Sequence, residues 1–247
     1  MSIRSAVPEP RTWQLEVAAV LDLTPRMRRV QLTSPDLDRF DYLTGQDMAL
    51  TFRKNDAPPV RRRYTIRRYD PQQRRLDLDF VLHGDGPGMR WAQAARPGDP
   101  IEVVAPRGKI TLVPDAAWHL FAGDATAVPG ALAMMEALPR DVPGLAFLQV
   151  DGAEERQAVS GGRAPQISWH YAVPAADDDG GLAATLAGAP LPPGRGHAYL
   201  AGEVALVSAV KATLLSRGWA AEDISAKAYW NRGRANAGHG EPELKAS

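Results

Sequence analysis

Hydrophobic and polar residues alternate in short segments through the first half of the chain. The alternation is clearest in residues 13–19 and 75–82, where Leu76, Leu78 and Phe80 are separated by aspartates. Because side chains of a strand point alternately to the two faces of a sheet, this pattern predicts half-buried β-strands. Further strands are expected at residues 30–32, 47–53, 63–69 and 101–104, with one short helix at 89–95. Short strands with a single helix predict a small antiparallel β-barrel over residues 12–113.

After Pro114 the pattern changes to strands that alternate with helices. Short apolar runs predict buried strands at residues 118–122, 145–150, 167–173, 198–201 and 226–230. Helices are expected at residues 131–138, around Gln157, between residues 181 and 190, and at 204–217. This alternation predicts a parallel sheet flanked by helices over residues 114–234, followed by a disordered tail at 235–247. By analogy at the level of the fold alone, a barrel followed by an α/β domain resembles the ferredoxin-reductase-like architecture, in which flavin lies on the barrel and nicotinamide docks on the second domain.

The two halves of the chain differ in charge although the whole is balanced. Lys+Arg and Asp+Glu number 29 each among the 247 residues. Residues 1–112 carry 19 basic and 14 acidic side chains, a difference of +5, and residues 113–247 carry 10 and 15, a difference of −5. A basic first half fits a domain that handles anions, although a solvated basic surface is the alternative. The basic residues are not interleaved with several aromatics, which argues against nucleic-acid binding.

The sequence lacks cysteine and long apolar segments, which limits the kinds of site and the cellular locations to be expected. The chain has no cysteine, which excludes disulfides, zinc–thiolate sites and iron–sulfur clusters held by cysteine. Electron transfer would therefore need an organic cofactor or a metal held by histidine and carboxylate. No run approaches the roughly 18 apolar residues that a membrane-spanning helix requires, and the first residues hold no apolar signal segment. We expect a cytoplasmic protein.

The strongest candidate for a binding site is the segment from Arg61 to Arg67, in which arginines surround Tyr64 and Thr65. Alternation would place Arg62 and Tyr64 on one side of a strand. A flavin nucleotide needs such a set: Tyr64 for the ring or ribose, Thr65 for a hydrogen bond near N5, and Arg62 for the pyrophosphate. The alternative is an exposed basic strand paired with the aspartates at positions 77 and 79.

A second candidate is the Gly-rich turn that begins at His83 and leads through Gly86 and Gly88 to Trp91. Glycines let backbone N–H groups approach a phosphate closely, and the amino terminus of a helix favours an anion. Gly/Pro clusters are more often simple turns. His83 alone is more often structural than catalytic.

In the second half, Gly-Asp and Gly-Glu pairs follow two predicted strands. Gly123 and Asp124 precede Thr126, and Gly202 and Glu203 recur at a second strand-to-helix junction. Ligands of parallel sheets bind at such junctions, so one shared cleft is expected. Thr126 could instead cap its helix, and Glu203 could be an acid favoured by the helix dipole.

The last predicted strand ends in Tyr229, Trp230, Asn231 and Arg232. One interpretation is a lid near the flavin, with Arg232 facing an anionic substrate. The alternative is a strand that packs its aromatics into the core.

In their order and spacing, these segments resemble the siderophore-interacting protein family of flavin-dependent ferric-siderophore reductases. The resemblance covers roughly residues 13–234. The matching residues are Arg62, Tyr64, Thr65 and Arg67; His83, Gly86, Pro87, Trp91 and Ala92; Pro106, Arg107 and Gly108; Gly123, Asp124, Thr126 and Ala127; and Gly202, Glu203, Tyr229, Trp230 and Gly233.

The resemblance implies that NAD(P)H reduces bound FAD, which passes single electrons to ferric iron in a siderophore, while the protein itself coordinates no metal. The implied FAD-binding residues are Arg62, Tyr64, Thr65, Arg67, His83, Gly86, Pro87, Gly88, Met89 and Trp91. The implied NAD(P)H-binding residues are Gly123, Asp124, Thr126, Ala127, Gly202 and Glu203. The implied substrate-facing residues are Lys54, Arg61, Lys109, Tyr229, Trp230 and Arg232.

The chain departs from the family pattern at four positions. Gly88 replaces the usual alanine, which we expect only to loosen the turn. Ala125 replaces an acid beside the expected nicotinamide cleft, and Ala228 and Asn231 stand where glycine and arginine are common. A flavin reductase with another electron acceptor, and a non-enzymatic protein that binds FAD or a siderophore, are alternatives. The sequence leaves open NADH or NADPH and the siderophore, and a monomer is expected.

Overall fold

The computed structural model describes residues 9–53, 58–160, 166–172 and 180–233. The chain divides into two compact units between Leu112 and Val113. Residues 9–112 are called the barrel unit and residues 113–233 the α/β unit. Lys54 and the predicted tail at 235–247 lie outside the described residues.

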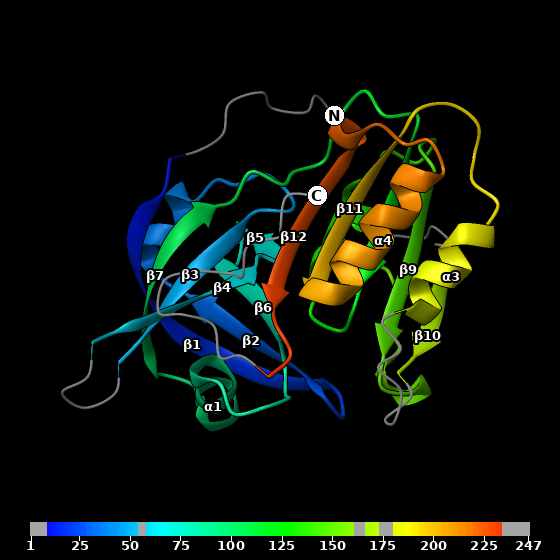
Figure 1. Cartoon of the computed structure of the whole chain (residues 1–247). Coiled ribbons are helices and arrows are strands. Elements are labelled where there is room, and N and C mark those ends of the chain that lie inside the picture. The colour runs from blue at the N-terminus through cyan, green and yellow to red at the C-terminus, as the bar shows by residue number, and fades with distance from the viewer. Residues whose placement is uncertain (1–8, 54–57, 161–165, 173–179, 234–247) are drawn as a thin grey trace. The chain divides into compact units, whose positions relative to one another are not determined.

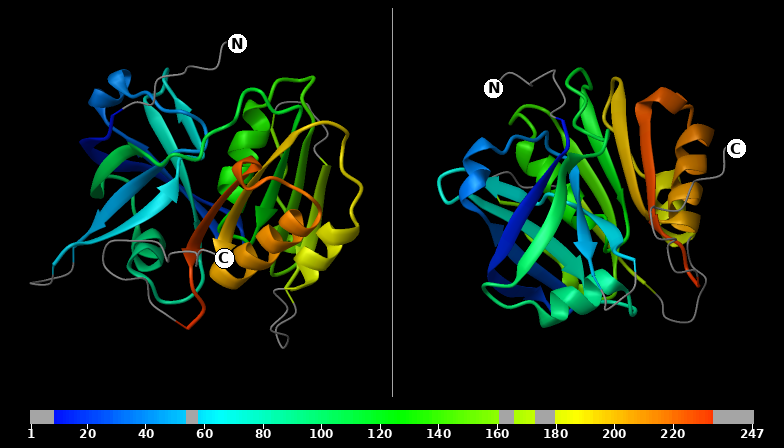
Figure 2. Two further views of the ribbon diagram at one scale, coloured as in Figure 1. Left: turned by 45° about the horizontal axis from the view of Figure 1, so that its top comes forward. Right: turned by 90° about the vertical axis from the view of Figure 1, so that its left-hand side faces the viewer.

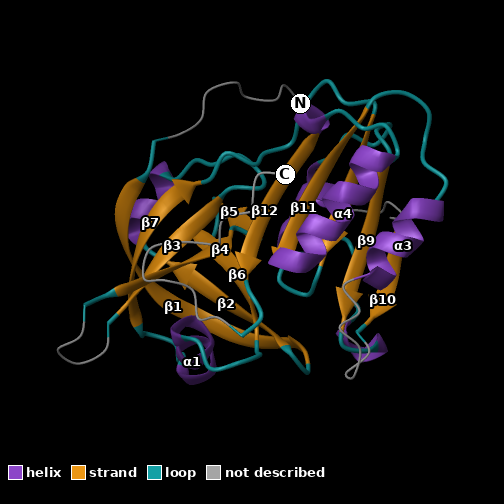
Figure 3. Cartoon of the chain, in the orientation of Figure 1, coloured by secondary structure: helices purple, strands orange, loops and turns teal. Residues whose placement is uncertain are grey.

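The barrel unit is a seven-stranded antiparallel sheet with the strand order β4-β3-β7-β1-β2-β6-β5. Its edge strands β4 and β5 are joined only by Ile66 and Arg67, so the sheet curls back on itself (Figure 3). One α-helix, α1 (Pro87–Ala94), follows β6 (Figure 1). The strands are β1 (Arg11–Thr24), β2 (Met27–Thr33), β3 (Asp47–Phe52), β4 (Val60–Thr65), β5 (Arg68–Asp70), β6 (Arg75–Val81) and β7 (Pro100–Arg107), and a 3-10 helix spans Pro35–Arg39.

The alternation seen in the sequence builds the core of the barrel unit. Leu76, Leu78 and Phe80 of β6 are at most 1% exposed and pack with Val30 and Leu32 of β2. Removing these apolar side chains from water is the main stabilisation of such a sheet.

The single strand predicted at residues 63–69 is wrong, because the segment divides into β4 and β5. At the break, the Ile66 N–H donates to the Gln46 carbonyl oxygen at 3.0 Å, and the Arg67 N–H donates to that of Asp77 at 2.9 Å. The backbone therefore leaves the side of β3 and continues beside β6 at this point.

The α/β unit is a five-stranded parallel sheet with the order β10-β9-β8-β11-β12. Helices α3 and α4 cover one face, and α2 lies on the other (Figure 2). The strands are β8 (Trp118–Gly123), β9 (Gly144–Val150), β10 (Gln166–Tyr171), β11 (Gly196–Glu203) and β12 (Ile224–Trp230). The helices are α2 (Val128–Ala137), α3 (Gly180–Gly188) and α4 (Val204–Ser216), with 3-10 helices at Ala153–Glu155 and Ala221–Asp223.

The helix predicted around Gln157 is wrong. A single 3-10 turn ends at Glu155, Arg156 is extended with φ −65° and ψ 139°, and residues 156–159 form a loop. The segment is short and lies between Gly152 and Gly161, too short for a helix to offset its costly first turn.

The strand order places a topological switch point between β8 and β11. The chain starts in the centre of the sheet at β8, moves outward through β9 and β10, and then crosses to β11 and β12. In sheets of this type ligands bind beyond the carboxyl ends of the strands at this point. Among the described residues, no helix is long and apolar enough to cross a membrane.

Candidate functional site

Strand β4 and helix α1 bring together two segments that the sequence presents separately. The register of β4 pairs Arg62 with Leu50 and Tyr64 with Met48, which puts both side chains on one side, as alternation predicts. The Tyr64 ring lies 4.2 Å from that of Phe80 between centroids. Burial raises the pKa of the Tyr64 hydroxyl. That hydroxyl lies against Gly88 of α1, where an added methyl group would come within 1.8 Å of its oxygen.

The amino terminus of α1 has the character of an anion site. Gly86 is its N-cap and makes no side-chain capping bond, and the first turn holds no acidic residue. Nothing lies within 4 Å of where a Cβ on Gly86 would be. Pro87 at the first helical position has no N–H, so the donors at this end begin with the N–H of Gly88, and the helix dipole favours negative charge there.

The other residues of this segment have different surroundings. His83 is exposed and Met89 is half-buried. Trp91 packs its ring 5.6 Å from Phe80 and 5.9 Å from Phe52, so it anchors α1 on the barrel.

The arginines near Tyr64 differ in their burial and in the partners described for them. Arg63 forms a two-bonded ion pair with Asp47, at 2.8 and 2.7 Å. Arg67 is 7% exposed, with its Nε 3.8 Å from Asp79. Arg62 is half-buried, donates to the Arg61 carbonyl oxygen at 2.9 Å, and has its pKa lowered by burial.

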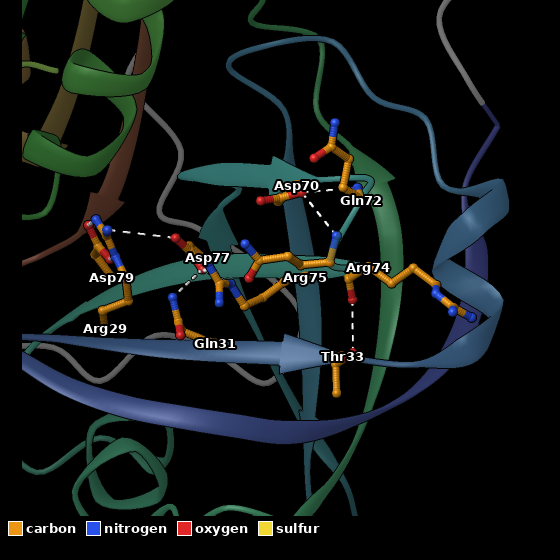
Figure 4. A network of polar contacts seen from close by, with 10 residues as sticks. Arg29, Gln31, Thr33, Asp70, Gln72, Arg74, Arg75, Asp77 and Asp79 are labelled. Carbon is orange, nitrogen blue, oxygen red and sulfur yellow. Dashed lines mark hydrogen bonds and ion pairs between the residues drawn. The ribbon is translucent and has the colours of Figure 1, made fainter. Parts of the chain in front are cut away.

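The carboxylates of Asp77 and Asp79, on β6, form hydrogen bonds with side chains of the neighbouring strand β2 (Figure 4). Arg29 donates to Asp79 at 2.6 and 2.8 Å, and Gln31 donates to Asp77 at 3.0 Å. Burial raises the pKa of Asp77, against the nearby charge of Arg29. Both aspartates are thus bonded to β2, and Arg67 also lies near Asp79, as the basic-strand alternative proposed for that pair.

In the α/β unit, Asp124 joins the carboxyl ends of three strands. Its Oδ1 accepts hydrogen bonds from the Thr126 N–H at 2.8 Å and the Thr126 hydroxyl at 2.5 Å. Its Oδ2 accepts from the Glu203 N–H at 2.7 Å and from the Trp230 Nε1–H at 2.8 Å. Thr126 therefore bonds to Asp124 and does not cap α2, whose N-cap is Ala127.

Glu203 caps α4, as the helix-dipole alternative proposed. Its side chain accepts hydrogen bonds from the N–H groups of Ala205 and Leu206, and its other oxygen accepts from the Arg232 N–H at 3.1 Å. The residue is 3% exposed. Its carboxylate therefore joins the start of α4 to the backbone that follows β12.

The glycines at these junctions allow close packing. A Cβ on Gly123 would lie 2.0 Å from the Ala201 carbonyl oxygen. Gly202 has φ +132°, and a Cβ there would lie 2.7 Å from the Asp124 carboxylate. Glycine is thus required at both strand ends.

The structure joins Trp230 to the predicted nucleotide loops, and the substrate-facing role of the cations stays a prediction. Trp230 bonds to Asp124, and Tyr229 lies 5.6 Å from the Lys227 ammonium. Arg61, Lys109 and Arg232 are exposed.

Sequence reasoning missed a buried histidine pair. His119 and His197 are directly opposed on β8 and β11 and are 3% and 6% exposed. Tyr199 lies with its hydroxyl 3.3 Å from His119 Nδ1. Burial, with a smaller contribution from His197, lowers the pKa of His119 to about 4. A signal was present, because His119 stands four residues before Gly123 and His197 stands five residues before Gly202, in the two Gly-acid pairs that the sequence singled out.

Comparisons with known proteins agree with this geometry. The model of the siderophore-interacting FAD-binding domain matches residues 43–110, and that of the siderophore-interacting protein matches residues 116–233. Ferric vibriobactin reductase ViuB of Vibrio cholerae is 37% identical over 180 residues, covering 71% of this chain and 66% of that protein. A siderophore utilization protein from T. fusca has a crystal structure with TM-score 0.85 at 32% identity, covering 94% of this chain and 97% of that one.

A more distant structure shows the fold alone. A ferredoxin NADP+ reductase from Neisseria gonorrhoeae has TM-score 0.66 at 15% identity, over 89% of this chain and 99% of that one. The predicted ferredoxin-reductase-like fold class is confirmed.

Proposed function

Because the chain belongs to the siderophore-interacting protein family, we propose that it is an FAD-dependent oxidoreductase that uses NAD(P)H to reduce ferric iron in a siderophore complex. The observation that carries this proposal is the contact of Tyr64 with the first turn of α1, inside the segment that matches the FAD-binding domain. One aromatic ring and one anion-favouring helix terminus thus lie together.

The residues around this contact fit FAD. The N–H groups at the start of α1 and the guanidinium of Arg62 would hold the pyrophosphate, because both favour a delocalised anion. The ring of Tyr64 would lie on the flavin, and Thr65 would donate a hydrogen bond to it. The chemistry that FAD supplies when bound is the conversion of a hydride equivalent into single-electron transfers. Arg67, which is paired with Asp79 of β6, would stabilise the strands of the barrel unit rather than contact a phosphate.

The loops beyond β8 and β11 are the proposed NAD(P)H site. The carboxylates of Asp124 and Glu203 are occupied by hydrogen bonds within the protein. We therefore infer that their role is to fix the loops, and that Gly123, Thr126 and Ala127 would contact the nucleotide through the backbone.

The protein does not need to coordinate iron for this reaction. Ferric iron prefers hard oxygen ligands, so reduction to ferrous iron weakens its hold in the chelate. What the protein must supply is a cationic approach for an anionic chelate, and exposed Arg61, Lys109 and Arg232 are the described candidates. Cytoplasmic location and a monomeric state stay predictions.

The test is the capture of ferrous iron by a coloured Fe(II) chelator, with purified protein, FAD, a ferric siderophore and either NADH or NADPH. The proposal predicts iron capture that requires protein, FAD and nucleotide together. Rapid nucleotide oxidation with free flavin or quinone, but no more iron capture than in protein-free controls, would show a different acceptor and contradict the proposal.

A further inference from the structure

Gly88 and Tyr64 share one small volume in the barrel unit. A Cβ on Gly88 would lie 1.8 Å from the Tyr64 hydroxyl oxygen, 2.8 Å from Cζ and 3.3 Å from Cε2. Contacts below 3.0 Å are essentially never made by real Cβ atoms. Any side chain at position 88 and the observed position of Tyr64 therefore exclude each other.

Neither the Tyr64 ring nor helix α1 can move away easily. The Tyr64 ring is backed by Phe80, 4.2 Å away and itself 1% exposed. Helix α1 is fixed to the barrel by buried Ala92, which is 0% exposed, and by the Arg28 guanidinium, which donates to the Ala92 carbonyl oxygen at 3.3 Å. Since packed interiors respond to one extra methyl group, Tyr64 would have to change rotamer.

We propose that Gly88 is a positioning residue: by lacking a side chain it admits the Tyr64 hydroxyl to the first turn of α1 and so sets the ring position that a flavin meets. Gly88 therefore does more than loosen the turn. It acts through Tyr64, whereas the sequence suggested a backbone contact to phosphate. This inference rests on the proposed flavin site at Tyr64.

Gly86 offers a matched control for this proposal. It lies two residues away in the same turn, has φ −81°, and has no atom within 4 Å of the Cβ position. Gly86→Ala therefore adds the same methyl group without meeting Tyr64. A second background, Tyr64→Leu, removes the ring and its hydroxyl, so it should abolish any effect that Gly88→Ala exerts through Tyr64.

The experiment measures the FAD dissociation constant and the visible absorption and circular dichroism of bound FAD in these variants. Gly88→Ala, which introduces the alanine usual in the family, is expected to leave FAD bound but to alter its visible bands and its circular dichroism, while Gly86→Ala leaves both unchanged and changes affinity less than about twofold. In the Tyr64→Leu background, Gly88→Ala should then leave the flavin bands unchanged. Equal effects of the two alanine variants, or an undiminished Gly88→Ala effect without Tyr64, would overturn the proposal.

A readout without flavin separates this inference from the proposed function. With fluorotyrosine incorporated, the ¹⁹F signal of Tyr64, assigned by its loss in Tyr64→Phe, should shift in Gly88→Ala and not in Gly86→Ala. If that shift occurs but wild-type protein binds no FAD, the flavin site fails while the packing relation stands. If FAD binds and the signal does not move, the positioning role is wrong. Should Gly88→Ala misfold, the Tyr64→Leu/Gly88→Ala variant should regain the far-ultraviolet dichroism and melting behaviour of Tyr64→Leu.

Discussion

Replacing Asp124 by alanine should destabilise the α/β unit by about 3 kcal/mol. The side chain accepts four hydrogen bonds, two of them local ones from Thr126. The other two come from the Glu203 N–H and the Trp230 Nε1–H, at 2.7 and 2.8 Å, and tie β8 to β11 and β12. The alanine variant removes the acceptor for all four at once.

The magnitude follows from the donors left behind. A buried donor without an acceptor costs about 1–3 kcal/mol. Thr126 can turn to water, because it is only half-buried, so its two bonds add little. Glu203 is 3% exposed and Trp230 is half-buried. Since Asp124 itself is half-buried, water can partly enter the vacated space, so each of the two donors is assigned about 1.5 kcal/mol, in the lower half of the range, which gives about 3 kcal/mol together.

The assay is thermal and urea unfolding, followed by circular dichroism and tryptophan fluorescence. For a unit of this size, the loss corresponds to a fall in Tm of roughly 10 °C. Asp124→Asn keeps one acceptor oxygen and should lose about half as much. Asp115→Ala, an exposed aspartate of the same unit, is the control and should leave Tm nearly unchanged. An Asp124→Ala variant with the same Tm as the Asp115→Ala control would refute the reasoning.

Three further perturbations test the packing and the electrostatics. The folded-state pKa of His119, about 4, lies below its ordinary value of 6.5; the unfolded chain therefore binds the proton first, and stability should fall by up to about 3 kcal/mol as pH drops from 6.5 to about 4. In urea unfolding across that pH range, the free energy of unfolding should fall less steeply for His119→Gln than for the wild type. The same pH dependence in both proteins would count against His119 as the cause. Gly123→Ala places a methyl group 2.0 Å from the carbonyl oxygen of Ala201 in β11 and should lower Tm by roughly several degrees. Gly188→Ala, whose added Cβ meets nothing within 4 Å, is the control and should leave Tm nearly unchanged. Asp79→Ala leaves the Arg29 guanidinium without its main partner and should cost about 3 kcal/mol in urea unfolding. The double variant Arg29→Met/Asp79→Leu should recover part of that loss, because buried Arg67 also loses the Asp79 carboxylate; a double variant no more stable than Asp79→Ala would point to packing instead.

Local patterns were sufficient to predict most of the fold. The two-residue period around Leu76 and Phe80 identifies β6 because one face of that strand is buried. The alternation of apolar runs with helix-forming segments identifies the parallel sheet, and α4 (Val204–Ser216) lies where it was expected. In both cases the information is carried by neighbours in the chain.

What the sequence could not supply depends on partners far away in the chain. The break at Ile66 is set by the Gln46 carbonyl oxygen and, for the next residue, by that of Asp77. The contact of Tyr64 with Gly88 needs the register of β4 and the path of α1 together. Asp124 and Trp230 are 106 residues apart, and no local signal joins them. Gly-Asp and Gly-Glu correctly indicated the strand ends, but not that their carboxylates bond to the protein itself.

The most direct test of the central claim is a stepwise anaerobic visible spectrum of the FAD-loaded protein. NADH or NADPH is added first, and a ferric siderophore second, with a trap for ferrous iron present. The account predicts that the flavin absorbance bleaches with pyridine nucleotide and returns with the ferric chelate as ferrous iron appears. Flavin that stays oxidised with both nucleotides, or protein that takes up no FAD, would contradict it.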